Sequence, residues 1–545
     1  MSPSTPYTTT SKKPGDTLYL ESRERRGNDG GTDFTTTGNK QKRVFCQVLD
    51  RIETLGNKLP DVITLFLIII AVILVASSIA SFLGWSTVNP TTNEKIVAVN
   101  LLSKDGIVRI FTEMVTNFTS FPPLGMVLSV MLGVGLAETT GLIGAAMKKI
   151  VLVSPRSLIL PIIVLVSLVG HSAADAAFII MPPIAAMVFV MMGRHPLAGM
   201  AAAYAAVAGG FSANLVIAVL DVTLASFTQT GAQMLEPNYQ SNPAMNYYFI
   251  IASTIMLVPL TVWITNKIVE PRLGTYIMEG PQQEENIQVK AEESRGLRWA
   301  GFTFLVCLII LLILTLPSGS LLRDPETDSL LVSPFMKSLV PILLFLFGIP
   351  SLAYGIGAGV IRSDRDVAEH LTKTMSGMGY YIVLAFVASQ MIAYFNWSNL
   401  GPIIAIEGAN FLKNIGLTGL PLLIIFILFT AIINLLIASA TAKWAILAPV
   451  FVPMFLLLDY SPALTQAAYR IGDSITNPIT PMLAYFGILL MFAKKYQNNL
   501  QMGTLISMLL PYTLLFALCW IVLFAVWFLL DLPLGPGHYI YHVKI

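Results

Sequence analysis

Charged residues are scarce in this sequence, and their scarcity decides the class of protein. Asp, Glu, Lys and Arg make up 12% of the 545 residues and hydrophobic residues 55%, whereas a soluble domain carries about 25% charged residues. Apolar runs long enough to cross about 30 Å of hydrocarbon recur along the chain, and the short alternating segments of a membrane β-barrel are absent. The sequence therefore predicts an all-α polytopic membrane protein embedded in a lipid bilayer.

Cysteine and histidine are also rare, which excludes several kinds of site. The three cysteines share no metal-ligand spacing, and the five histidines form no zinc-binding motif. We therefore interpret the cysteines as packing residues and expect no bound cofactor. The net charge of +2 does not indicate a nucleic-acid partner, and we expect none.

The basic residues predict the orientation of the chain, because short cytoplasmic loops are enriched in Lys and Arg. The motif "KQKR" at 40–43 lies before the first apolar run and places the N-terminus in the cytoplasm. Composition divides the chain into five segments: a disordered polar tail (1–43), a first half (44–267), a charged cytoplasmic linker (268–298), a second half (299–530) and a C-terminal tail (531–545). The apolar runs predict about nine transmembrane helices plus two re-entrant hairpins.

Each half contains a short polar stretch inside an apolar run. In the first half, "SAADAAFIIMP" at 172–182 contains Asp175; in the second, "SATAKWAILAP" at 439–449 contains Lys443 and Trp444. A charged residue at membrane depth is costly, and it is a functional-site candidate for that reason. Lys443 is expected either to snorkel or to pair with an acidic group.

Two re-entrant hairpins account for these stretches. The first spans about 157–193 with its tip at 171–175, and basic residues flank both ends, so it is expected to open to the cytoplasm. The second, about 420–458, has one lysine in its flanks and is expected to open to the outside. Irregular backbone at this depth must be buried in protein or line a cavity. The alternative is a set of ordinary short spans, which fits the charge pattern poorly.

A helix with a break follows each hairpin. The helix over 197–220 breaks at "AGGFSAN", and the helix over 462–492 breaks at "GDSITNP", because Gly and Pro in a helix cost about 1 and 3 kcal/mol relative to Ala. Both helices contain Ala-Ala-Tyr before the break. A hairpin plus a broken helix, repeated with opposite sidedness, predicts an inverted repeat with one binding site near the membrane midplane.

The polar residues near the second break are candidate ligands. Arg470 and Asp473 lie three residues apart on one helical face, and they either pair with each other or serve the substrate and the coupling ion. The planar guanidinium of Arg470 suits a substrate carboxylate. Asp473, with Asn434 and Asn477, offers oxygen ligands to Na⁺ or a carboxylate to a proton.

Further candidates come from the two tips and the first break. Trp444 is either a stacking surface for an aromatic substrate or a packing residue. Asp175 is expected to take part in ion coupling, with Ser212 and Asn214 as its partners in the first break. Asp221, at the outer end of its span, is expected to be a solvated helix cap.

These motifs, "GHSAADA", "SATAKWAILAPVFVPMF" and "SPALTQAAYRIGDSITNPITP", resemble those of the p-aminobenzoyl-glutamate transporter (AbgT) family, and the resemblance runs from about 45 to 530. It implies a homodimer in a bacterial inner membrane, with a transport core that contains the hairpins and a frame that forms the dimer contact. It also implies ion-coupled transport of p-aminobenzoyl-glutamate, which is an aromatic carboxylate, or export of sulfonamide antimetabolites. The protein would then be a transporter and not an enzyme.

The functional residues of the family, carried over by motif, fall on the second half: Thr441, Trp444, Pro462, Arg470, Asp473 and Pro481, with Asn434 near the cation. Ser439 adds a hydroxyl at the same tip. Threonine stands at 441, where the family pattern has serine, so the hydroxyl is kept and a methyl group is added. The first tip has alanines where the family has more hydroxyls, which leaves the first-half ligands open.

Three other functions are compatible with parts of the sequence. A sodium-coupled dicarboxylate transporter of a related fold would also place Ser, Asn and Thr at both tips, but Trp444 argues against it. An intramembrane enzyme would need a nucleophile with its base or a metal dyad, and the apolar runs contain neither. A passive channel would not need two asymmetric hairpins or buried charges. Competition by succinate would indicate the dicarboxylate transporter, and hydrolysis of the substrate would indicate the enzyme. Accumulation of substrate against its gradient would exclude the channel.

Overall fold

The computed structural model describes seven stretches of the chain: 61–88, 94–170, 176–276, 289–330, 333–480, 483–498 and 500–542. Three predicted features lie outside these residues: the polar tail 1–43, the first hairpin tip with Asp175, and Pro481. The described residues form helices and one two-stranded sheet, so the predicted all-α class is confirmed.

The helices of the first half are α2 (Val62–Phe82), α3 (Lys104–Thr119), α4 (Pro122–Thr139), α5 (Leu142–Leu152), α6 (Ile159–Gly170), α7 (Ala176–Met191), α8 (Pro196–Gly209), α9 (Val219–Ala232), α10 (Tyr247–Ile264) and α11 (Glu270–Leu273). Those of the second half are α12 (Ala291–Thr315), α13 (Pro334–Lys337), α14 (Leu339–Ala358), α15 (Asp364–Gly377), α16 (Gly379–Trp397), α17 (Leu400–Asn414), α18 (Gly419–Leu436), α19 (Ala440–Leu456), α20 (Pro462–Ile475), α21 (Ala484–Lys494) and α22 (Met502–Leu529). Short 3₁₀ helices are η1 (Arg156–Leu158) and η4 (Asn477–Ile479), and η3 (Thr265–Val269) is a π-helical segment between α10 and α11. Strands β1 (Ser86–Val88) and β2 (Lys95–Val97) pair antiparallel, with Thr87 opposite Ile96.

The number of candidate membrane spans is close to the predicted nine, but the helices differ: α18 and α6, which were predicted as hairpin arms, are among them, whereas α8 is too short to be counted. Eight segments of the described chain are long and apolar enough to cross a membrane, and a ninth is added if α5 and η1–α6, which bend by 118°, count as one span. Large apolar side chains on these helices, such as Phe302 and Ile313 of α12, are exposed. Lipid rather than protein covers such residues in a membrane protein.

The predicted hairpins coincide with two pairs of helices. Helices α6 and α7 flank the first tip, and α18 and α19 meet at 437–439. Each pair is followed by two helices with an interruption between them: α8 and α9 lie on either side of the non-helical residues 210–218, and α20 and α21 lie on either side of a segment that contains η4.

Helical structure extends beyond the predicted segments in several places. Helix α9 continues to Ala232, past the predicted end at 220, because the carboxylate of Asp221 caps a new helix by accepting from the amide of Ala218 at 2.6 Å. Helix α12 begins at Ala291, inside the predicted linker 268–298. Helices α3, α15 and α17 were not anticipated, because they lack the continuous apolar run on which the prediction relied.

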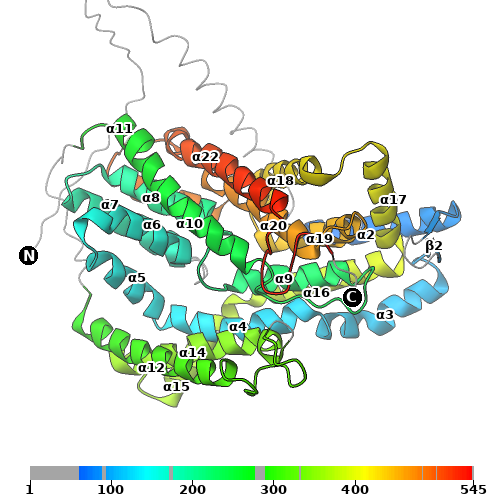
Figure 1. Cartoon of the computed structure of the whole chain (residues 1–545), viewed down its shortest axis with the longest axis horizontal. Coiled ribbons are helices and arrows are strands. Elements are labelled where there is room, and N and C mark those ends of the chain that lie inside the picture. Colours follow the sequence, from blue (N-terminus) through cyan, green and yellow to red (C-terminus); the bar gives the residue numbers. More distant parts are fainter. Residues whose placement is uncertain are drawn as a thin grey trace, which may run out of the picture. The chain divides into compact units, whose positions relative to one another are not determined.

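One group of helices forms a layer at one side of the fold. Helix α14 packs against both α4 and α12, as Figure 1 shows, and α4 also contacts α15 and α9. Close approach between α4 and α14 depends on Gly133, where a Cβ atom would clash with the carbonyl oxygen of Leu344.

Helices α8 and α20 form the interior of the fold. Every residue of both helices is buried. Ser461 caps α20 by accepting from the amide of Leu464 at 3.1 Å, and Pro462 occupies the first turn, where its missing N–H costs nothing. A Cβ atom at Gly472 would lie 2.7 Å from Cβ of Thr430, so glycine lets α20 pack tightly against α18.

The C-terminal segment, residues 531–542, joins the start of α20 to the loop between α9 and α10. The amide of Ser461 donates to the carbonyl of Ile540 at 2.9 Å, and Nε2 of His542 is 2.8 Å from a carboxylate oxygen of Glu236. Burial lowers the pKa of His538 to about 4, so its ring is neutral at pH 7 and accepts from the amide nitrogen of Asn242 at 3.1 Å.

Candidate functional site

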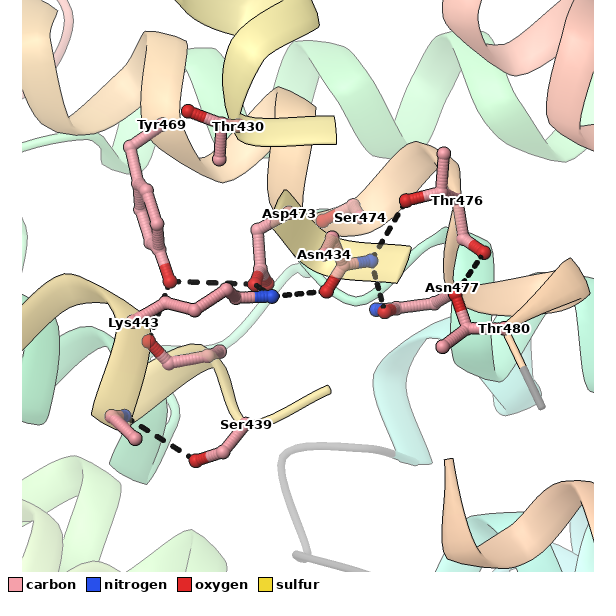
Figure 2. A network of polar contacts seen from close by, with 12 residues as sticks. Thr430, Asn434, Ser439, Lys443, Tyr469, Asp473, Ser474, Thr476, Asn477 and Thr480 are labelled. Carbon is pink, nitrogen blue, oxygen red and sulfur yellow. Dashed lines mark hydrogen bonds and ion pairs between the residues drawn. The ribbon is translucent and has the colours of Figure 1, made fainter. Parts of the chain in front are cut away.

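Three helix ends meet where the charged side chains gather. Helix α18 ends at Leu436, α19 begins at Ala440, and α20 ends at Ile475. Ser439 caps α19 by accepting from the amide of Ala442 at 3.3 Å, which satisfies one of the free N–H groups at a helix start. Figure 2 shows the side chains near these ends pointing toward one another. We call this group the polar cluster; it consists of Asn434, Lys443, Tyr469, Asp473 and Asn477.

A buried ion pair lies within the polar cluster. The ammonium of Lys443 is 2.5 Å from Oδ1 of Asp473, and both side chains are almost fully buried. The same ammonium donates a hydrogen bond to Oδ1 of Asn434. A buried charge is tolerated here because it has a counter-charge and a further acceptor. Of the two roles expected for Lys443, the structure shows pairing with an acidic residue.

Two aromatic residues lie beside this ion pair. The hydroxyl of Tyr469 donates to the carbonyl of Ala440 at 2.5 Å and lies 3.3 Å from Oδ1 of Asp473. Trp444 stacks on the ring of Tyr469, with centroids 4.3 Å apart, and its Nε1 donates to Oγ1 of Thr228 at 2.8 Å. Trp444 is fully buried, so one ring face and its N–H group are engaged within the protein.

Two asparagines connect the polar cluster to the first half of the chain. The amide nitrogen of Asn434 donates to Oδ1 of Asn477 at 2.7 Å. The amide nitrogen of Asn477 donates in turn to the carbonyl of Ala208 at 3.1 Å, in the last turn of α8. Since α8 ends at the first break, the two breaks of the chain lie next to each other.

Arg470 pairs with Asp221 and not with its neighbour Asp473. Nη1 of Arg470 is 2.6 Å from Oδ1 of Asp221, and both side chains are buried. The expectation that Asp221 is solvated is therefore wrong: its carboxylate does cap α9, but its counter-charge comes from α20. Arg470 and Asp473 therefore do not pair with each other, which was one of the two roles expected for them.

Two donor groups next to this second ion pair have no partner among the described residues. They are Nε of Arg470 and Nε2 of Gln466. Gln466 precedes Arg470 by four residues, so both lie on one face of α20. Oε1 of Gln466 accepts from the amide nitrogen of Asn246 at 3.0 Å. Buried donors are normally bonded, and these two can be offered to a ligand carboxylate.

The predicted first-half ligands lie in the break between α8 and α9. Ser212 and Asn214 are both buried. Oδ1 of Asn214 accepts from the amide of Leu215 at 2.8 Å, whereas its Nδ2 and the hydroxyl of Ser212 have no hydrogen-bond partner within the described chain. Their predicted partner Asp175 lies outside the described residues.

The other predicted site residues are spread more widely. Ser439 is exposed and Thr441 half-buried, so both hydroxyls lie at the accessible side of the hairpin end. Pro462 begins α20 and lies eleven residues before Asp473, or about 16 Å along the axis at 1.5 Å per residue, so it is not part of the polar cluster. Pro481 lies outside the described residues.

The site holds two buried cations and two buried carboxylates in separate pairs. Such pairs can exchange partners: an anionic ligand can compete with Asp221 for Arg470, and a cation can compete with Lys443 for Asp473.

Sequence reasoning missed Asp221 and Tyr469 as parts of this arrangement. Charge balance could have indicated Asp221, because Lys443 and Arg470 together need two counter-charges and the second half supplies only Asp473 near them.

Comparisons with known proteins agree with this architecture. The sequence profile of the AbgT putative transporter family matches residues 47–542. The p-aminobenzoyl-glutamate transport protein of Escherichia coli (strain K12) is 38% identical over 489 residues, which cover 90% of this chain and 96% of that protein. The crystal structure of the Alcanivorax borkumensis YdaH transporter is 40% identical with a TM-score of 0.84, over 88% of this chain and 100% of that one. The structure of Neisseria gonorrhoeae MtrF, described as illuminating a class of antimetabolite efflux pumps, is 42% identical with a TM-score of 0.83, over 90% and 99% of the two chains.

Proposed function

Because the chain belongs to the AbgT family of multi-pass membrane transporters, we propose that it moves p-aminobenzoyl-glutamate across a bacterial inner membrane by ion-coupled alternating access. One observation carries the proposal: α20 bears two buried ion pairs, one to the hairpin helix α19 and one to the first-half helix α9. Intramembrane charges of this kind mark substrate and ion pathways. The name of the Escherichia coli relative supports the substrate class.

The chemistry of the site suits an aromatic substrate with carboxylates. Arg470 and Gln466 offer free donors for a carboxylate on one face of α20, and a guanidinium binds a carboxylate in two-pronged fashion. The hydroxyls of Ser439 and Thr441 lie at the N-terminal end of α19, where the helix dipole favours an anion. The stacked rings of Trp444 and Tyr469 give an aromatic surface, and a substrate ring can stack on it if these two rings move apart.

Alternating access needs one part of the protein to move against another. We assign the moving part to the hairpins and to α8, α9 and α20, which share the buried polar contacts. The layer of α4, α12 and α14 is the frame, and the exposed apolar side chains of α12 favour lipid or a second copy of the chain in a homodimer. The N-terminus is assigned to the cytoplasm on the strength of the basic residues before α2.

The test is transport by the purified protein in sealed proteoliposomes. Labelled p-aminobenzoyl-glutamate is followed under an imposed proton gradient and, separately, a Na⁺ gradient. Accumulation is expected in wild type and is expected to be lost in Arg470→Gln, while Arg109→Gln, an exposed arginine on α3, serves as the matched control. Absence of accumulation under both gradients in vesicles shown to be tight would contradict the proposal.

A second candidate activity is export of sulfonamide antimetabolites, which the likeness to MtrF favours. Loading inside-out vesicles with a labelled sulfonamide measures it directly, and competition between the two compounds shows whether they share the site. Succinate serves as the third compound: strong competition by a plain dicarboxylate would favour the dicarboxylate transporter instead.

A further inference from the structure

The oxygen atoms that the sequence assigned to a coupling cation are engaged by the protein's own groups. Oδ1 of Asp473 and Oδ1 of Asn434 both contact the ammonium of Lys443, and Oδ1 of Asn477 accepts from the amide nitrogen of Asn434. Figure 2 shows the ammonium between Asp473 and Asn434. The predicted Na⁺ ligands therefore come together, but in this arrangement they do not fit a Na⁺ ion.

Charge balance leads to the same result. Lys443 and Asp473 form a neutral pair in a buried site. A Na⁺ ion added beside them would leave a net positive charge in a medium of low dielectric constant, where an uncompensated charge is strongly disfavoured. Na⁺ can bind Asp473 only after the ammonium has left.

A second carboxylate could relieve this conflict, but the helices around α19 do not supply one. The helices that pack against α19 are α9, α16, α17 and α20. Their carboxylates other than Asp473 are Asp221, which is paired with Arg470, and Glu407 of α17, which accepts from the hydroxyl of Thr87 at 2.7 Å. Asp473 is thus the single carboxylate that these helices place against Lys443.

We propose that Lys443 is the residue that sets cation selectivity: its tethered ammonium occupies the cation position, so Na⁺ does not bind at Asn434, Asp473 and Asn477, and a Na⁺ gradient does not drive transport through them. The consequence for transport rests on the proposed function. The statement about Na⁺ binding does not, because it concerns the purified protein without any substrate.

The experiment measures binding of radioactive sodium to the purified full-length protein at constant ionic strength, with choline as the replacement cation. Wild type is expected to show no saturable Na⁺ binding. Lys443→Met removes the ammonium and keeps the length of the side chain, so the buried Asp473 carboxylate loses its partner and is expected to bind Na⁺ saturably, at least about tenfold more tightly than wild type. The gain is expected to vanish in Lys443→Met/Asp473→Asn.

The matched control is Lys413→Met, because Lys413 is an exposed lysine of α17 that donates to the carbonyl of Leu457, at the C-terminal end of α19 and away from Lys443. This variant is expected to bind no more Na⁺ than wild type. If Lys443→Met does not fold, Lys443→Gln, which retains a donor for Asn434, replaces it.

Two outcomes overturn the proposal. The first is saturable Na⁺ binding by wild type that Asp473→Asn abolishes, since the ion would then displace the lysine. The second is a folded Lys443 variant that gains no Na⁺ binding. Neither outcome depends on knowing the substrate, so the Na⁺-binding measurement can be interpreted even if the transport assay fails. Uptake of p-aminobenzoyl-glutamate driven by Na⁺ in wild type would reject this inference and would support the proposed function.

Discussion

Two neighbouring regions of the molecule, the polar cluster of the second half and the break of the first half, carry different chemistry. The polar cluster, where α18, α19 and α20 meet, carries charged side chains that are paired and hydrogen-bonded, as in the contact of Lys443 with Asp473 and Asn434. The first-half break, 210–218, carries neutral side chains, and polar atoms of Ser212 and Asn214 have no hydrogen-bond partner within the described chain.

This difference suggests a division of labour between the halves. Paired buried charges hold helices in register and cost much to separate, so the two ion pairs of α20 hold α19 and α9 against it. Unpaired neutral groups cost less to leave open and can bind a ligand without first breaking an ion pair. The following substitutions test this contrast, from the largest expected effect to the smallest.

Replacing Asp473 removes one of the two buried ion pairs, the pair with Lys443. In Asp473→Asn the ammonium of Lys443 stays buried without a counter-charge, which is expected to lower the free energy of unfolding by about 3–5 kcal/mol and to abolish transport. Thermal denaturation in detergent measures the loss. Lys443→Met/Asp473→Asn removes both charges and is expected to recover most of the stability; a double variant as unstable as the single one would contradict the importance of the pair.

A double-mutant cycle tests whether α9 is held to α20 by charge. Asp221→Asn and Arg470→Gln are each expected to destabilise the protein, and their coupling free energy is expected to be about 0.5–3 kcal/mol, because the two side chains form an ion pair at 2.6 Å. Additive effects would show that the pair contributes no coupling. Pairing Asp221→Asn with Lys413→Met provides the control cycle, since these residues share no contact and should be additive.

Trp444→Phe tests a hydrogen bond in the paired region without changing charge. The variant loses the bond from Nε1 to Thr228 and keeps an aromatic ring against Tyr469. Stability is expected to fall by about 1 kcal/mol, with a partial loss of transport. Trp527→Phe, near the C-terminal segment, is the matched control, and it is expected to retain substrate affinity. Equal losses of affinity in both variants would remove Trp444 from the site.

Ser212→Ala probes the unpaired region and should have the smallest effect. Its hydroxyl has no hydrogen-bond partner among the described residues, so thermal stability is expected to stay unchanged. If the hydroxyl contacts substrate, affinity falls by about two- to tenfold, the value of one hydrogen bond. Thr223→Ala, a buried threonine that bonds its own helix, controls for removal of a hydroxyl. Unchanged substrate affinity in Ser212→Ala would show that the hydroxyl of Ser212 does not contact the substrate.

The sequence predicted the fold better than it predicted the side-chain pairs. Apolar runs and interrupted helices depend on local composition, so the positions of α18, α19 and α20 followed from residues close together in the chain. The partner of Arg470 did not, because Asp221 is far away in sequence and the local candidate Asp473 was equally suitable by spacing. Helices such as α15 were missed because an amphipathic helix, here capped by Ser363 in a capping box, has no long apolar run.

The C-terminal segment has a practical consequence for anyone preparing this protein. Residues 531–542 fasten the start of α20 to the loop between α9 and α10 through Ile540 and His542, and α20 carries both buried ion pairs. An affinity tag or fluorescent protein fused soon after His542 is therefore close in sequence to these contacts. A bulky or rigid fusion can disturb them and, through them, the position of α20. A long flexible spacer protects the contact, and a cleavable tag allows tagged and untagged protein to be compared in the same assay.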